Sequence, residues 1–186
     1  MIIIITGASH TGKTRLAQMM MEKYRFPYVS EDHIKMGLIR SGYTDLTPED
    51  DGKMAEYLWP VIREMIKTAI ENNQNMIIEG CYIPFDWKKD FSDEYLKNIE
   101  FICICLSSGY IDAHFNDIKQ HACCIETRLD DSCCTADAVK SENQFYFEGC
   151  KSHNLDVVLI ENNYDEEIKK ILEKQYPKPQ CSNSVC

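Results

Sequence analysis

The feature that most constrains this chain is a glycine-rich loop near its start. Residues 7–14 read Gly-Ala-Ser-His-Thr-Gly-Lys-Thr, a full match to the phosphate-binding pattern G-x-x-x-x-G-K-[ST]. The β-branched run before it, residues 2–6, is typical of a buried strand, and residues 15–24 after it are rich in helix formers. Because strand, loop and helix follow in the order that a phosphate site requires, a chance glycine turn is the weaker interpretation.

Each part of the loop has an expected task in binding a nucleoside triphosphate. Gly7 and Gly12 allow backbone conformations that aim N–H groups at an anion. A helix that opens at Lys13 adds the positive end of its dipole, and the lysine itself can reach the β- and γ-phosphates. The Thr14 hydroxyl can ligate Mg²⁺. The sequence therefore predicts ATP and Mg²⁺ as cofactors, with ATP bound by Gly7, Ala8, Ser9, His10, Thr11, Gly12, Lys13 and Thr14.

Length and charge limit the partners of such a site. With 186 residues, 44% hydrophobic and 27% charged, the chain is expected to form one folded domain over residues 1–176. The formal net charge is −10 and no basic run is present, so a nucleic acid polymer is not expected as a ligand. The apolar start, residues 1–5, is too short for a signal or a membrane span. We therefore expect a cytoplasmic protein with a small-molecule substrate and no membrane partner.

Ten cysteines raise the question of disulfides or bound metal. The missing secretory signal argues against a disulfide scaffold. Cys103 and Cys105 alternate in an apolar run and are typical of small buried side chains in a strand. Two adjacent pairs could together hold zinc, although structural zinc sites usually separate paired cysteines by two to four residues. These pairs are Cys123-Cys124 and Cys133-Cys134. Residues 177–186 are expected to form a loose C-terminal tail.

The rest of the chain alternates predicted strands and helices. Further strands are predicted at 28–29, 75–80, 101–106 and 156–160. Helices are predicted over 32–40, from Pro48 to about residue 69 with Thr47 as N-cap and a kink near Pro60, and over 165–175. Five buried-type strands that alternate with helices predict an α/β fold, in which a five-stranded parallel sheet has helices on both faces.

Ligands of parallel sheets bind beyond the carboxyl ends of the strands, so residues 7–14, 30–33 and 79–82 form the candidate site. Asp32 is positioned to take a proton from the hydroxyl of a second substrate, the acceptor of a phosphate group from the triphosphate. Its alternative role is that of a helix N-cap. Glu31 is the competing carboxylate, on the other face of the strand end. Glu79 is expected to hold Mg²⁺ through water or to bind the acceptor, and a salt bridge at the strand end is the alternative.

In the phosphate loop, in residues 32–40 and in Glu79-Gly80, the chain resembles the P-loop kinases of small molecules. This group contains adenylate kinase, shikimate kinase, chloramphenicol phosphotransferase and the zeta-toxin kinases. The resemblance implies a three-layer P-loop NTPase fold. It also implies that Asp32 acts on the acceptor hydroxyl, that Arg40 grips the acceptor, and that Arg128 belongs to a lid that closes on the triphosphate. Lids of nucleotide kinases usually carry several arginines, whereas this segment carries one.

These observations together predict an ATP-dependent phosphotransferase that acts on a small molecule. Lys13, Asp32 and Arg128 are the expected catalytic residues, and Asp32, Arg40, Glu79 and Gly80 are the expected acceptor contacts. Residues 33–57 are expected to form an acceptor-binding flap and residues 111–139 a lid. The alternatives are a nucleoside monophosphate kinase and a regulatory P-loop protein that binds ATP without phosphorylating anything.

Overall fold

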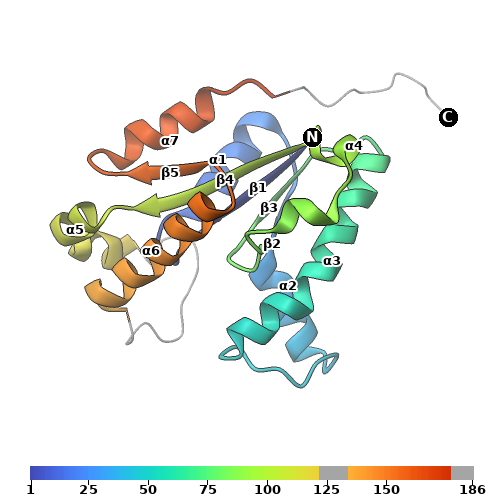
Figure 1. Ribbon diagram of the computed structural model, residues 1–186, viewed down its shortest axis with the longest axis horizontal. Coiled ribbons are helices and arrows are strands. Elements are labelled where there is room, and N and C mark those ends of the chain that lie inside the picture. The colour runs from blue at the N-terminus through green and yellow to red at the C-terminus, as the bar shows by residue number, and fades with distance from the viewer. Residues whose placement is uncertain (122–133, 177–186) are drawn as a thin grey trace.

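The computed structural model describes residues 1–121 and 134–176, and its centre is a sheet of five parallel strands (Figure 1). The strand order is β2-β3-β1-β4-β5, and every neighbouring pair is parallel. The strands are β1 Ile2–Gly7, β2 Tyr28–Ser30, β3 Met76–Glu79, β4 Ile99–Leu106 and β5 Val157–Ile160. The predicted α/β class and the five-stranded parallel sheet are confirmed.

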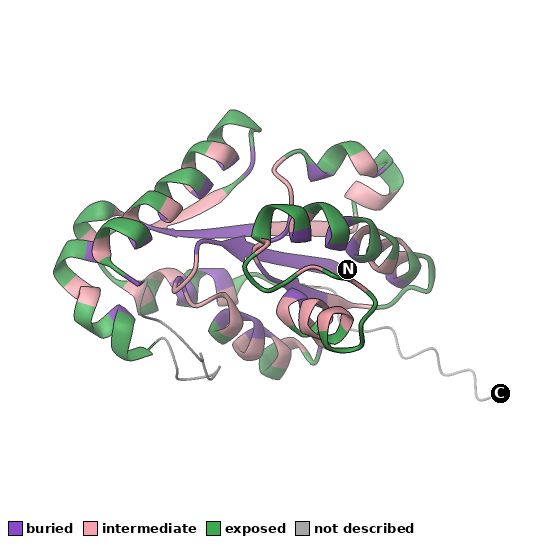
Figure 2. Cartoon of the chain, turned by 90° about the horizontal axis from the view of Figure 1, so that it is seen from below, coloured by how far each residue is buried: buried purple, intermediate pink, exposed green. Residues whose placement is uncertain are grey.

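Helices cover both faces of this sheet, so that the strands are the most buried part of the chain (Figure 2). They are α1 Lys13–Tyr24, α2 Glu31–Arg40, α3 Asp51–Glu71, α4 Asp93–Leu96, α5 Ser108–His121, α6 Ala136–Ser152 and α7 Tyr164–Glu173, with a 3₁₀ turn, η1, at Trp87–Asp90. Side chains of β1 alternate between the two cores. Ile3 and Ile5 pack with α1, α5 and α7, whereas Ile2 and Ile4 pack with α3 and α6.

Helix α3 begins later than its sequence indicates. The predicted start at Pro48 with Thr47 as cap is wrong, because residues 47–50 close a turn of their own. The Asp50 carboxylate accepts hydrogen bonds at 3.0 Å from both the N–H and the hydroxyl of Thr47. The backbone N–H of Asp50 donates to the Thr47 carbonyl at 3.1 Å. Asp50 is therefore the residue that precedes the helix, and α3 continues past Pro60.

Residues 111–139, the predicted lid, contain more regular structure than their sequence suggests. Residues 111–121 lie in α5, and residues 136–139 form the start of α6. Residues 122–133, with Arg128 and three of the four cysteines of the predicted zinc pairs, lie outside the described residues. The fourth, Cys134, is buried just before α6. Cys103 and Cys105 are fully buried in β4, as predicted.

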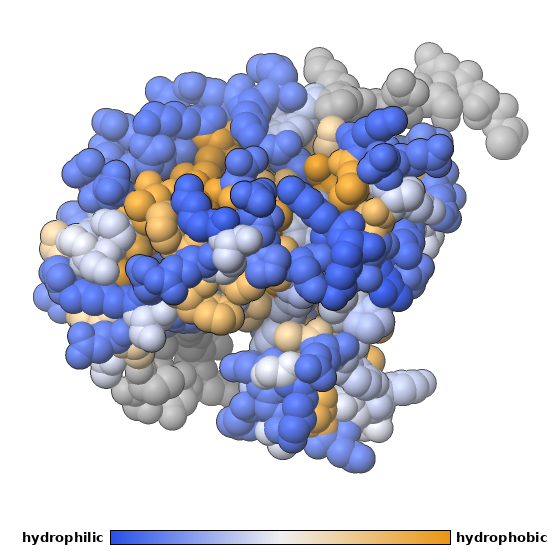
Figure 3. All heavy atoms as spheres, in the orientation of Figure 1, coloured by the Kyte–Doolittle hydropathy of each residue, from blue (hydrophilic) through white to orange (hydrophobic). Residues whose placement is uncertain are grey.

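Hydrophilic side chains predominate on the face in Figure 3, with apolar groups showing between them. Across residues 1–121 and 134–176, no helix has the length and apolar character needed to span a membrane. The predicted tail, residues 177–186, also lies outside the described residues.

Candidate active site

The phosphate loop connects β1 to α1, and its two glycines are required by backbone conformation and by close neighbours. Gly7 has φ 137° and Gly12 has φ 81°, both in the region that favours glycine. A Cβ atom at position 7 would lie 2.1 Å from the Ile104 carbonyl oxygen, and one at position 12 would lie 2.0 Å from the Tyr164 hydroxyl. Any side chain at either position would therefore displace β4 or the tyrosine that covers the loop.

The loop opens into a cavity of about 660 Å³ at the carboxyl ends of the strands. The Lys13 ammonium group donates to the Ala8 carbonyl at 2.8 Å, and the Thr14 hydroxyl lies 3.4 Å from both carboxylate oxygens of Glu79. The cavity is lined by Ser9, His10, Gly12, Lys13, Thr14, Arg15, Asp32, Glu79, Cys81, Leu106, Tyr110, His114, Asp117, Ile118, His121, Tyr164 and Asp165. The structure thus brings Lys13, Thr14, Asp32 and Glu79 to one space, as the sequence predicts.

Asp32 lies in the first turn of α2, where Ser30 occupies the capping position, so the N-cap alternative for Asp32 is wrong. Its carboxylate is 45% exposed and pairs at 3.0 Å with Lys35, one turn further along the helix. Lys35 also donates to the Tyr82 hydroxyl at 2.7 Å, and that hydroxyl donates to Asp51 at 2.8 Å. This chain of contacts connects α2, the segment after β3 and the start of α3, and it restricts the position of the Asp32 carboxylate.

Glu31 is fully buried, and it lies beneath the segment that follows β3. One carboxylate oxygen, Oε2, accepts from the Tyr82 N–H at 2.8 Å, and a Cβ atom at Gly80 would lie 2.1 Å from it. The other oxygen has no hydrogen-bond partner in the part of the chain that the structure describes. Burial raises the pKa of Glu31 from 4.5 to about 8. The hydrogen bond from the Tyr82 N–H lowers this pKa, and the nearby charges of Glu79 and Asp32 raise it. Glu31 is therefore mostly protonated at neutral pH.

The other predicted residues lie at varying distances from this arrangement. Gly80 packs against Glu31 and does not line the cavity. Arg40 is exposed at the last residue of α2 and is likewise not among the lining residues. Ser9 and His10, which belong to the predicted ATP-binding loop, both line the cavity, and His10 has φ 64°. Acceptor contacts by Arg40 and Gly80 stay predictions.

Lys35 and Tyr164 were not singled out as site residues from the sequence. Lys35 could have been found, because its spacing of three from Asp32 puts both on one side of a helix. Cys81, within the predicted segment 79–82, lies two residues after the end of β3 and lines the cavity, and burial raises the pKa of its thiol to about 12. The hydroxyl groups of Tyr82 and Tyr164 make hydrogen bonds to residues far away in the sequence, and no local pattern indicates such contacts.

Comparisons with known proteins show which fold this chain shares. No protein-family model and no curated protein matches the chain. Among solved structures, deoxyadenosine kinase from M. mycoides with bound dATP superposes with a TM-score of 0.56 and 18% identity, covering 92% of this chain and 97% of that one. A candidate kinase from Chloroflexus aurantiacus gives 0.54 and 17%, covering 94% and 98%. The chain has the fold of the P-loop kinases.

A third similar structure is a gluconokinase from Sinorhizobium meliloti 1021, with a TM-score of 0.50 and 11% identity over 91% of this chain and 88% of that one. These identities are low, so the likeness concerns the fold. At that level the resemblance drawn from the phosphate loop is confirmed.

Proposed function

We propose that this P-loop fold is an ATP-dependent phosphotransferase, which moves the γ-phosphate of ATP to a small molecule that bears a hydroxyl or phosphate group. The observation that carries the proposal is the single cavity in which Lys13 and Thr14 of the phosphate loop meet the carboxylates of Asp32 and Glu79. The shared fold with a deoxyadenosine kinase and a gluconokinase supports it.

The loop side of the cavity would bind the triphosphate of ATP. Positive-φ glycines and the start of α1 present N–H groups and a helix dipole to an anion. Lys13 now donates to the Ala8 carbonyl, a neutral partner that a phosphate oxygen can replace. Since a hydrogen bond to a charged partner is stronger than one to a carbonyl, this exchange favours nucleotide binding.

The donor set beside the loop fits Mg²⁺. A hydroxyl and a carboxylate are oxygen ligands of the kind that this ion prefers, and Thr14 and Glu79 lie within 3.4 Å of each other. Thr14 would hold the ion directly, with Glu79 directly or through water. When bound, Mg²⁺ would compensate part of the phosphate charge.

Asp32 would act on the acceptor. As the acceptor oxygen forms its bond to the γ-phosphorus, the bond from that phosphorus to the β-phosphate oxygen breaks and ADP leaves. For a hydroxyl acceptor, the Asp32 carboxylate takes the proton that the hydroxyl loses. Lys35 holds the carboxylate in place at 3.0 Å. Residues 33–57, which comprise most of α2, a connecting loop and the start of α3, would contact the acceptor, with Arg40 and Gly80 as proposed contacts.

A transfer screen tests the proposal. The protein is incubated with γ-labelled ATP, Mg²⁺ and a panel of nucleosides, nucleoside monophosphates, sugars and hydroxy acids, with Lys13→Ala as the inactive control. Labelled product with one acceptor class is the expected result. Transfer to nucleoside monophosphates alone would favour the nucleotide-kinase alternative. Release of inorganic phosphate regardless of acceptor would favour the regulatory alternative, and absence of ATP binding would contradict all three.

A further inference from the structure

A carboxylate from α6 occupies donors of the phosphate loop. One oxygen of Glu142 accepts a hydrogen bond from the Ser9 N–H at 2.9 Å and another from the Ser9 hydroxyl at 3.1 Å. Ser9 lines the same cavity as Lys13 and Thr14. Glu142 comes from a helix 133 residues further along the chain, so the contact is tertiary and has no counterpart in the loop motif. An acidic group therefore lies against a loop whose proposed ligand is a polyanion.

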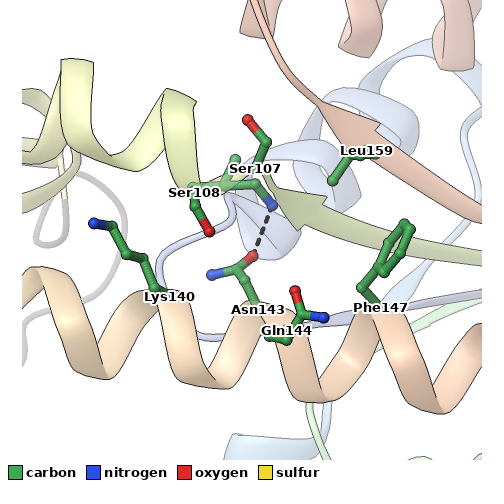
Figure 4. A pocket seen from close by; sticks show the side chains of 8 residues that line it. Ser107, Ser108, Lys140, Asn143, Gln144, Phe147 and Leu159 are labelled. Atoms are coloured by element: carbon green, nitrogen blue, oxygen red, sulfur yellow. Dashed lines mark hydrogen bonds between the residues drawn. The ribbon is translucent and has the colours of Figure 1, made fainter.

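Helix α6, which carries Glu142, is held in place because two neighbouring residues are anchored at the end of β4 and after β3. The buried side chain of Asn143 accepts from the Leu106 N–H at the end of β4 at 2.7 Å (Figure 4). It also donates to the Val139 carbonyl at 2.8 Å. One turn further along, the Tyr146 hydroxyl donates to the Cys81 carbonyl after β3 at 2.7 Å. Helix α6 thus contacts the segments after β1 and β3 and the last residue of β4, so a shift of the helix would loosen all three contacts.

Such a carboxylate opposes the binding of phosphate in two ways. It uses an N–H and a hydroxyl of the loop that would otherwise be open to a phosphate oxygen, and its negative charge repels the phosphates through space. The repulsion grows with the number of phosphate charges, so it acts more strongly on ATP than on ADP.

We propose that Glu142 is a further determinant of the nucleotide site, which weakens polyphosphate binding according to the charge of the nucleotide. Its role is the opposite of that of Lys13, and it keeps the proposed enzyme from holding ATP too tightly. The inference rests on the proposed function, since it assumes that the loop binds a nucleotide.

The test is calorimetric titration of the full chain with MgATP and with MgADP, comparing wild type with Glu142→Gln. Glutamine keeps an oxygen that Ser9 can donate to and removes the charge. We expect MgATP to bind about fivefold more tightly to the variant and MgADP about twofold, since removing one nearby charge changes an interaction by on the order of 1 kcal/mol. The gain for MgATP should shrink between about 50 and about 500 mM salt, because salt screens repulsion between charges.

A matched control is Glu148→Gln, which removes the same charge from the same helix where the carboxylate accepts from Gln144 instead of the loop. It should leave both affinities unchanged. Glu142→Ala serves as a second charge-free variant if the glutamine variant does not fold in a thermal melt without nucleotide. Equal or weaker ATP binding by the charge-free variants would overturn the role of Glu142 while leaving the proposed function in place. A wild-type protein that binds neither nucleotide would contradict both.

Discussion

The two sides of the cavity are built differently. The proposed phosphate side consists of eight consecutive residues, 7–14, that would act mostly through their backbone and through the start of α1. The proposed acceptor side depends on Asp32 and on side chains that hold it in place: Lys35 on α2, Tyr82 after β3 and Asp51 at the start of α3. A site made from consecutive backbone carries a local sequence pattern, whereas a site made from converging side chains has none. Substitutions on the two sides should accordingly affect different properties.

The largest effect is expected from Lys13→Ala on the phosphate side. The substitution removes a cation from the mouth of the sheet, where it makes one hydrogen bond to a carbonyl, so the fold should be kept. ATP affinity should fall by on the order of a thousandfold, the upper range for losing a key donor to a phosphate-like charge. Calorimetry measures this, with the exposed Lys53→Ala as control. Unchanged affinity would show that the loop is not a phosphate site.

Asp32→Asn should separate the two sides of the cavity most clearly. Asparagine keeps the size and hydrogen bonding of the side chain but cannot take a proton at neutral pH. Transfer to a hydroxyl acceptor should fall by about a hundredfold or more, the usual scale for losing a positioned base, while ATP affinity should hardly change. Steady-state kinetics with an acceptor from the panel checks this, and Asp156→Asn in the exposed loop before β5 is the control. Near-normal turnover of the variant would rule out a catalytic role for Asp32.

Glu31 should make stability depend on pH. Its pKa is about 8 in the folded protein against an ordinary 4.5, so the folded protein retains a proton that the unfolded chain loses between these values. This contribution to stability is complete below pH 4.5 and is lost as the pH rises through about 8. The slope should be at most about 1.4 kcal/mol per pH unit.

Glu31→Gln removes this titration and keeps the shape of the side chain. Urea unfolding at about pH 5, 6.5 and 8 should show a flatter profile for the variant than for wild type, with the slopes differing most near the middle of this range, where the folded and unfolded states differ most in bound protons. Glu49→Gln, which changes an exposed carboxylate, should keep the wild-type slope. If wild type and Glu31→Gln have parallel profiles, Glu31 is ionised in the folded protein and the acceptor side is more polar than described.

The smallest effect is expected from Tyr82→Phe, which removes the hydroxyl between Lys35 and Asp51 but keeps the buried ring. Lys35 then holds Asp32 less firmly, so kcat should fall by about three- to tenfold with the KM for ATP unchanged, the effect of losing about one or two hydrogen bonds. Tyr95→Phe, which removes an exposed hydroxyl that donates to the Glu71 carboxylate, should have no effect. A change in both kcat and KM would indicate general loosening instead of a role in positioning.

The sequence by itself predicted the phosphate loop and determined the class of fold. Residues 2–14 specify strand, loop and helix through β-branched residues, glycines and helix formers, all of which act locally. The five apolar runs then require a parallel sheet with both faces covered. Even the position of Asp32 follows from this, since parallel strands end at one edge of the sheet. Local patterns failed at Thr47, where the Asp50 side chain forms a turn that competes with the helix.

Tertiary structure alone decided how differently two adjacent carboxylates are surrounded. Glu31 and Asp32 are chemically alike and follow the same strand, but successive residues of a helix point in directions about 100° apart. Packing against Gly80 and the Tyr82 N–H buries Glu31 and raises its pKa, whereas Asp32 is left in the cavity beside Lys35. The contact between Glu142 and Ser9 likewise depends on where α6 lies across the strand ends. Burial and long-range contacts set these roles, and neither is encoded in the residues next to them in the chain.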